Sequence, residues 1–151
     1  MKIYIAAFLA GFSLLGFCKA EDNPRNGIER RVSRVITNFT KGHDLKGWHV
    51  EDDVVMGGVS RGNLSITKEG FARFSGRLSL ANGGGFSSIQ TFFAPIDVSS
   101  FSKAMLRIKG DGKRYYFRVQ STVQERHSYV FPFDTTGQWQ IVEIPFNQMY
   151  A

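Results

Sequence analysis

Cysteine is scarce in this chain: Cys18 is the only one among 151 residues. A single cysteine forms neither an intramolecular disulfide nor a multi-thiolate metal site, so packing must stabilise the fold. The three histidines, His43, His49 and His127, show no metal-ligand spacing. No serine lies in a nucleophile-elbow pattern, and no glycine-rich loop has the spacing that holds a phosphate before a helix. The sequence therefore predicts no catalytic group, no metal site and no cofactor.

Long apolar runs are also few, and the longest lies at the N-terminus. Lys2 precedes an apolar stretch, Ile3 to Phe17, that only Ser13 interrupts, and Cys18-Lys19-Ala20 follows it. This layout is typical of a secretory signal peptide. The stretch is shorter than the roughly 20 residues that span a bilayer. We therefore expect residues 1–20 to be cleaved after Ala20 and the protein to be exported to the periplasm or the extracellular space. An uncleaved segment that tethers the protein to the membrane is the alternative.

Positive charge exceeds negative charge only modestly. The formal net charge is +6, and the expected signal peptide carries two of the lysines, Lys2 and Lys19. This balance does not predict a nucleic-acid-binding protein. Residues 21–34 are polar and arginine-rich, which favours a linker, with a basic arm that touches a membrane surface or an acidic partner as the alternative. The domain is then expected to cover residues 35–151.

Sustained helical periodicity is absent, and alternation every second residue takes its place. In Ala72–Leu80 the apolar residues occupy one face and arginines or serines the other, which predicts a half-buried strand bent at Gly76. Similar patterns predict strands near residues 47–51, 63–67, 86–93, 106–109, 113–120, 128–133 and 142–147.

Proline is rare, and the turns depend on glycine: the chain has four prolines and sixteen glycines. Turn signals lie at residues 41–42, 61–63, 82–85, 110–112 and 136–137, where glycine or asparagine tolerates a positive φ. Fourteen phenylalanines, five tyrosines and two tryptophans supply large side chains that suit sheet surfaces. Short strands with frequent turns predict a single all-β domain, a jelly-roll type of β-sandwich.

The first candidate site is the loop after Trp48. Asp52-Asp53 precede Met56-Gly57-Gly58, and Ser60 follows two residues later. Carboxylates beside glycines suit a hard cation or a donor group of a partner, because glycine lets another backbone approach closely. The alternative is that the carboxylates accept hydrogen bonds from the loop itself.

Two further glycine-rich loops are candidates. The glycines of Asn82-Gly83-Gly84-Gly85-Phe86 indicate either a tight connection between strands or a surface that a ligand approaches. Gly110-Asp111-Gly112 lies between two alternating runs and favours a hairpin, with Asp111 as a candidate partner contact.

Outward-facing basic residues predict a cationic sheet face around Tyr116. An aromatic ring among guanidinium groups stacks on sugars or on partner side chains. The alternative is a solvated face that discourages edge pairing. The basic residues are Arg73, Arg77, Arg107, Lys109, Arg114 and Arg118.

Several motifs occur in an order that resembles the complex I intermediate-associated protein 30 family. The resemblance covers about Val35 to Met149. Mitochondrial members of that family are assembly factors of NADH:ubiquinone oxidoreductase. The motifs are Trp48, Asp52-Asp53, Met56-Gly57-Gly58 with Ser60, Phe74-Ser75-Gly76, Asn82 with Gly84-Gly85-Phe86, Gly110-Asp111-Gly112 with Tyr115, and Trp139 with Ile144-Pro145-Phe146.

The resemblance implies a galactose-binding-like β-sandwich and a non-catalytic role that holds assembly intermediates. It implies a protein partner, and its likeness to carbohydrate-binding jelly rolls makes a sugar ligand the alternative. Nothing in the sequence looks like a site for NADH or quinone. The family domain continues for about one more strand pair, so we expect this chain to lack its last strands and to be poorly stable alone. The expected partner-binding residues are Asp52, Asp53, Met56, Gly57, Gly58, Ser60, Asn82, Gly84, Gly85, Phe86, Asp111 and Tyr116.

Overall fold

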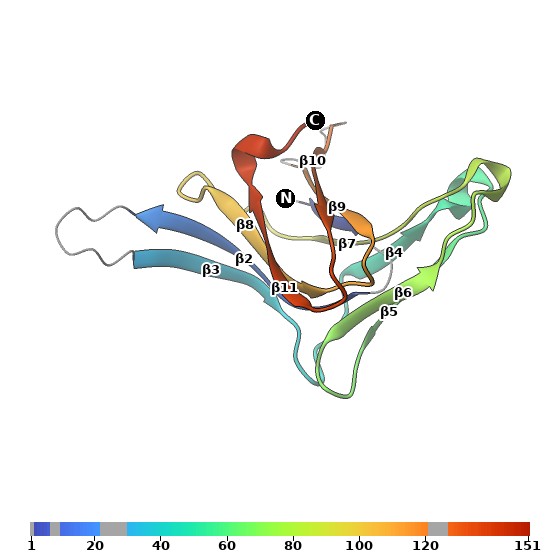
Figure 1. Ribbon diagram of the computed structural model, residues 1–151, viewed down its shortest axis with the longest axis horizontal. Helices are drawn as coiled ribbons and strands as arrows, with labels where there is room; N and C mark the ends of the chain where they lie inside the picture. Colours follow the sequence, from blue (N-terminus) through green and yellow to red (C-terminus); the bar gives the residue numbers. More distant parts are fainter. Residues whose placement is uncertain (1, 7–9, 22–29, 121–126) are drawn as a thin grey trace.

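A computed structural model describes residues 2–6, 10–21, 30–120 and 127–151 (Figure 1). Nearly all regular structure in these ranges is β-strand, arranged in two sheets that enclose one apolar core. Within the same ranges, helical structure is limited to short 3-10 turns at Asp53–Met56, Ala81–Gly83 and Phe146–Gln148. The predicted all-β sandwich with little helix is therefore confirmed.

The first sheet has five strands, and all neighbouring pairs in it are antiparallel. In spatial order they are β10 (Tyr129–Asp134), β9 (Arg114–Gln120), β1 (Lys2–Ala6), β7 (Ser87–Phe92) and β4 (Trp48–Asp52).

The second sheet has six strands, again paired antiparallel. Five follow one another as β11 (Trp139–Pro145), β8 (Lys103–Lys109), β2 (Ala10–Glu21), β6 (Ala72–Arg77) and β5 (Arg61–Ile66). The sixth strand, β3 (Arg30–Asn38), pairs with the later part of β2.

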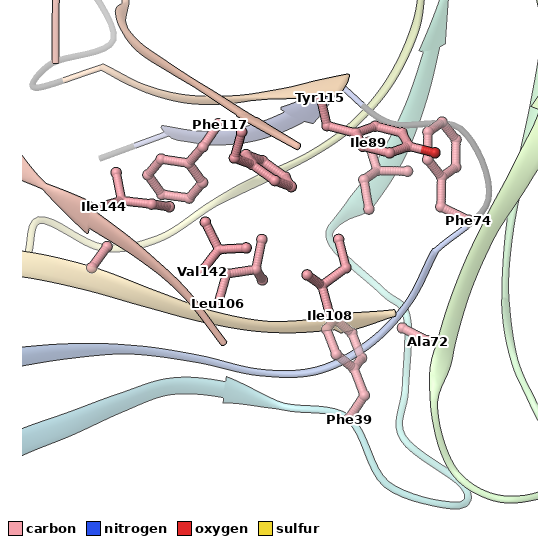
Figure 2. Close-up of a cluster of buried hydrophobic side chains, with 12 residues drawn as sticks. Phe39, Ala72, Phe74, Ile89, Leu106, Ile108, Tyr115, Phe117, Val142 and Ile144 are labelled. Carbon is pink, nitrogen blue, oxygen red and sulfur yellow. The ribbon is translucent and has the colours of Figure 1, made fainter. Parts of the chain in front are cut away.

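The strands predicted from two-residue alternation are confirmed, because their inward residues form the core. Leu106 and Ile108 of β8, Phe117 of β9 and Ile144 of β11 are fully buried. Figure 2 shows these side chains converging between the two sheets, with Phe74 of β6 at the other end of the cluster. The alternation thus sets which face of each strand meets the opposite sheet.

The N-terminal residues occupy the middle of both sheets, a placement that the sequence did not predict. β1 lies between β7 and β9, and β2 lies between β8 and β6. Cleavage after Ala20 would remove β1 and all but one residue of β2. Of the expected linker, 22–29 lies outside the described residues and 30–34 belongs to β3. Removal of residues 1–20, and with it the start of the domain, stays a prediction.

Three local predictions were wrong, one of them because the connection crosses between the sheets. The turn at Asp111 joins β8 of the second sheet to β9 of the first, so it is not a hairpin. The residues from Arg61 to Asn63 lie inside β5 and not in a turn. β6 ends at Arg77, so Leu78 and Leu80, expected on the inward face of a strand, are exposed.

Candidate functional site

The candidate site is the end of an arm that projects from the sandwich, at the right of Figure 1. β4 pairs with β7 in one sheet, and β5 pairs with β6 in the other. Residues 53–60 connect β4 to β5, and residues 78–86 connect β6 to β7, so both loops cross between the sheets. We call these two loops together the apolar tip.

Asp53 ties the two loops of the apolar tip together. Its side chain is fully buried. Within its own loop the carboxylate accepts hydrogen bonds from the Ser60 hydroxyl at 2.6 Å and the Ser60 N–H at 3.0 Å. From the other loop it accepts the N–H of Gly85 at 2.6 Å and that of Phe86 at 3.3 Å. The carboxylate therefore adds to the backbone bond between the two loops, in which the Asp53 N–H donates to the Phe86 carbonyl oxygen at 3.3 Å.

Two glycines make room for this carboxylate. A Cβ on Gly58, in the first loop, would collide with the Asp53 side chain, and so would a Cβ on Gly84, in the second. Gly57 has a different reason to be glycine, because its φ of 86° lies in the left-handed region. The glycines that looked like a surface for an approaching ligand therefore let the two loops close on Asp53.

Asp52 forms a second tie at the base of the tip. Its Oδ1 accepts the N–H of Gly62 on β5 at 3.0 Å and the hydroxyl of Ser87 on β7 at 2.6 Å. A single side chain thus joins strands of both sheets. At the outer end, the Asn82 side-chain amide donates to the carbonyl oxygen of Gly57 at 3.1 Å. The loops are held at their base, middle and outer end.

The hydrogen bonds keep Asp53 ionised. The Ser60 hydroxyl contributes most to lowering the pKa of Asp53 below its usual value, and the N–H groups of Gly85, Ser60 and Phe86 act in the same direction. Burial opposes them, since it disfavours the charged form. Both carboxylates are occupied by donors of the protein, which is the second of the two interpretations left open by the sequence.

The outward side of the apolar tip is apolar. Val55, Leu80 and Met56 are 83%, 82% and 71% exposed. The buried Asp53 is the one ionisable residue in 53–60 and 78–86, so the tip presents no charged side chain. Exposed apolar clusters of this kind are common at interaction surfaces, which makes the tip a candidate site. Its large side chains are Val54, Val55, Met56, Val59, Leu78, Leu80 and Phe86.

Ten of the twelve predicted site residues lie at this tip or its base, and two do not. Asp111 holds the turn between β8 and β9, where it accepts hydrogen bonds from the Tyr115 hydroxyl and the Lys113 N–H. Tyr116 is partly exposed on β9, which β1 and β7 separate from β4. The expected single cationic face is wrong, because Arg114 and its neighbour Arg118 lie in the first sheet. The other four basic residues, Arg73, Arg77, Arg107 and Lys109, lie in the second.

Two of the histidines, which could otherwise bind a metal ion or transfer a proton, pack against aromatic rings. His43 meets the edge of Phe39, and His49 meets Phe92. Across the described ranges, no three His, Cys, Asp or Glu side chains group in a way that would hold a metal ion.

Sequence reasoning missed most of the apolar side chains of the tip. Leu78 and Leu80 continued the alternation of β6, so they were assigned to the core, and Val54, Val55 and Val59 were not singled out. The signal that would have found them is the lack of exposed charge across two glycine-rich loops that are together rich in aliphatic residues. Such loops have no charged side chain to keep them in water.

Known proteins resemble this chain in sequence. The family model of complex I intermediate-associated protein 30 (CIA30) matches residues 37–151, which include both loops of the tip. The mitochondrial complex I intermediate-associated protein 30 of Mus musculus is 25% identical over 157 aligned positions, covering 86% of this chain. The alignment covers 46% of the mouse protein, so the chain spans about half the length of that relative. No solved structure matches the chain significantly. With its family model matched over most of its length, this chain belongs to the complex I intermediate-associated protein 30 family.

Proposed function

We propose that this protein is a non-catalytic binding module that holds a protein partner during the assembly of a larger complex. The apolar tip is its recognition surface. The observation that carries the proposal is the exposure of seven large apolar side chains on two loops that a buried carboxylate holds in place. A preorganised apolar surface binds without the cost of ordering its loops.

Family membership supports a protein as the partner. The mouse relative is named for its association with intermediates of complex I, and the proposal extends an assembly role of that kind to this chain. Protein interfaces are apolar and depleted in charge at their centre, as the tip is. Asp52, Asp53, Ser60 and the glycines then act as positioning residues, while Met56 and Phe86 contact the partner.

Affinity capture from membrane extracts of the source cells tests this proposal. The native chain should recover a defined complex, and a Val55→Ser/Met56→Ser/Leu80→Ser variant should recover at least tenfold less. Ile141→Ser is the matched control, because Ile141 is also an exposed aliphatic residue but lies on β11. Recovery of no defined complex, or equal recovery by the tip variant, would refute the proposal.

Carbohydrate binding is a second candidate, and Tyr116 favours it. Its ring is 39% exposed on β9, with Arg114 and Arg118 two residues away on the same face. An exposed ring with flanking cations stacks on sugar rings. A glycan array with the native chain and with Tyr116→Ala decides this: binding that the substitution removes supports a sugar site, and a flat array excludes it.

Export is the proposed route of the protein, on the strength of the layout of residues 1–20. The mouse relative is named mitochondrial, so export would place this member elsewhere. Among the described residues, no helix has the length and apolar character needed to cross a membrane. The N-terminal sequence of the protein isolated from its source decides between cleavage after Ala20 and a retained tether.

A further inference from the structure

The N-terminal segment combines the sequence pattern of an export signal with two strands of the fold. Its sequence has the layout of an export signal, with an apolar stretch and a cleavage point after Ala20. In the folded chain the same segment forms β1 and β2. An export signal must be bound by the targeting machinery, whereas a strand must be bound by its neighbours.

β1 is paired along both edges in the first sheet. Ile3 faces Thr91 of β7 on one side and Val119 of β9 on the other. β7 and β9 are not paired with each other, so β1 is their only link within the sheet order. The backbone of this segment therefore has no free edge at which another protein could add a strand.

β2 is held in the same way in the second sheet. Gly11 faces Lys109 of β8 and Arg73 of β6. Further along, Phe17 faces Ala104 of β8 and Arg34 of β3. The apolar stretch of the signal is thus enclosed by strands over nearly its whole described length.

The expected cleavage point also lies in a ladder. Ala20 pairs with Arg31, and Glu21 pairs with Arg30, both on β3. A protease binds its substrate as an extended chain with free backbone groups, so these pairs must open before the bond is cut. These pairs lie beyond Cys18, the last residue of β2 that pairs with β8, so they open at lower cost than the pairs of the apolar stretch, whose opening costs a large part of the free energy of unfolding.

We infer that residues 2–6 and 10–21 have two mutually exclusive partners, the export machinery and the sheets of their own chain, so that folding withdraws the signal. This inference rests on the proposed export of the protein. Export and cleavage then depend on binding of the segment by the targeting machinery before the sheets close.

The order of synthesis provides the time for that binding. The segment precedes its partner strands in the chain: β3 follows it closely, whereas β6, β7, β8 and β9 are synthesised later. At ordinary rates of synthesis, about 5–20 s separate residue 21 from residue 120. Pairing between distant segments is also slow to form once the chain is complete. The apolar stretch is therefore accessible early and becomes enclosed along both edges late.

A delay experiment with the full chain tests the inference. The purified protein is unfolded in urea and diluted into native buffer, and signal peptidase in detergent micelles is added after increasing delays. Intact-mass measurement gives the fraction that has lost residues 1–20, and tryptophan fluorescence gives the rate of folding. The cleavable fraction should fall with the same time constant as folding, by at least tenfold in total.

Two variants sharpen the test. Phe117→Ala removes a fully buried side chain from β9 and should keep the chain cleavable for longer, whereas Ile141→Ala, at an exposed position on β11, should behave like the native chain. Ala20→Arg should block cleavage at every delay, which identifies the bond. Equal cleavage at all delays would overturn the inference and leave export intact. No cleavage of the freshly diluted native chain would overturn both.

Discussion

The Ser60 hydroxyl donates a hydrogen bond of 2.6 Å to the buried Oδ2 of Asp53. The same Ser60 oxygen accepts a hydrogen bond from the N–H of Ser79 at 3.0 Å, so Ser60 links Asp53 to the second loop. The apolar tip is therefore held by buried polar contacts while its outward side is apolar. Its shape depends on a few side chains that no partner needs to touch.

The lack of a side chain at Gly58 leaves room for Asp53, and a substitution there tests this. Gly58→Ala should destabilise the protein by about 1–3 kcal/mol, because the added Cβ collides with the carboxylate of Asp53. In an Asp53→Gly background the same substitution should cost much less, since the three atoms nearest that Cβ, the Cβ, Cγ and Oδ1 of Asp53, are gone. Urea unfolding of the four proteins measures the difference.

Gly57→Ala is the matched control for that cycle. No atom lies near a Cβ at Gly57, and the cost there comes from its left-handed backbone, at about 1–2 kcal/mol. This cost should be the same with and without Asp53. If Gly58 behaved like Gly57, the collision would not be the reason for glycine at that position.

The pH dependence of stability follows from the lowered pKa of Asp53. Unfolding returns the carboxyl to its ordinary pKa of about 3.9. The ionised, hydrogen-bonded form therefore stabilises the folded state above that pH, and this contribution is lost as the pH falls through the lowered pKa of the folded state. The urea midpoints of the native protein and Asp53→Asn should differ most near neutral pH and converge at acidic pH. A gap that stayed constant down to pH 2 would contradict this role.

Substitutions of two leucines should distinguish the tip from the core by their effect on stability. Leu106→Ala should cost about 2–5 kcal/mol, because the side chain is fully buried between the sheets. Leu80→Ser should change the free energy of unfolding by less than about 0.5 kcal/mol, because 82% of that side chain is exposed. Thermal unfolding of both variants checks this, and a strongly destabilised Leu80→Ser would return Leu80 to the core, where its alternation had placed it.

Shortening the chain to residues 21–151 should strongly lower the midpoint of thermal unfolding. The shortened chain lacks β1 and all of β2 except Glu21, so β7 and β9 lose their link, as do β6 and β8. Differential scanning calorimetry of the full and shortened chains measures the effect. A monomeric shortened chain with a sharp transition near that of the full chain would show that the two sheets close without these strands.

The fold class and most strands were predictable, because burial of one face leaves a period of two in the sequence. In β8 and β9 the alternating residues are buried as the pattern indicates. Which strands pair was not predictable, since Asp111-Gly112 reads as a hairpin whether the chain stays in one sheet or crosses to the other. The pairing of β8 with β2 and β11 decides this, and no local signal carries it.

The location of the site was predictable and its chemistry was not. Glycines and carboxylates marked the two loops, but each residue alone permitted either a ligand or an internal hydrogen bond. The choice depends on a contact between Asp53 and Gly85, whose loops are separated by two strands, β5 and β6, along the chain. The prediction that Leu80 lies in the core was wrong for a related reason. Alternation does not show where a strand ends, and β6 ends at Arg77.

The crossing of both tip loops has a mechanical consequence. Each loop is a joint between the two layers, so any sliding of one sheet over the other must move the strand ends that meet at Asp52 and Asp53. A molecule bound to these loops would restrict that sliding. It would thereby reduce the motion of strands that it does not contact.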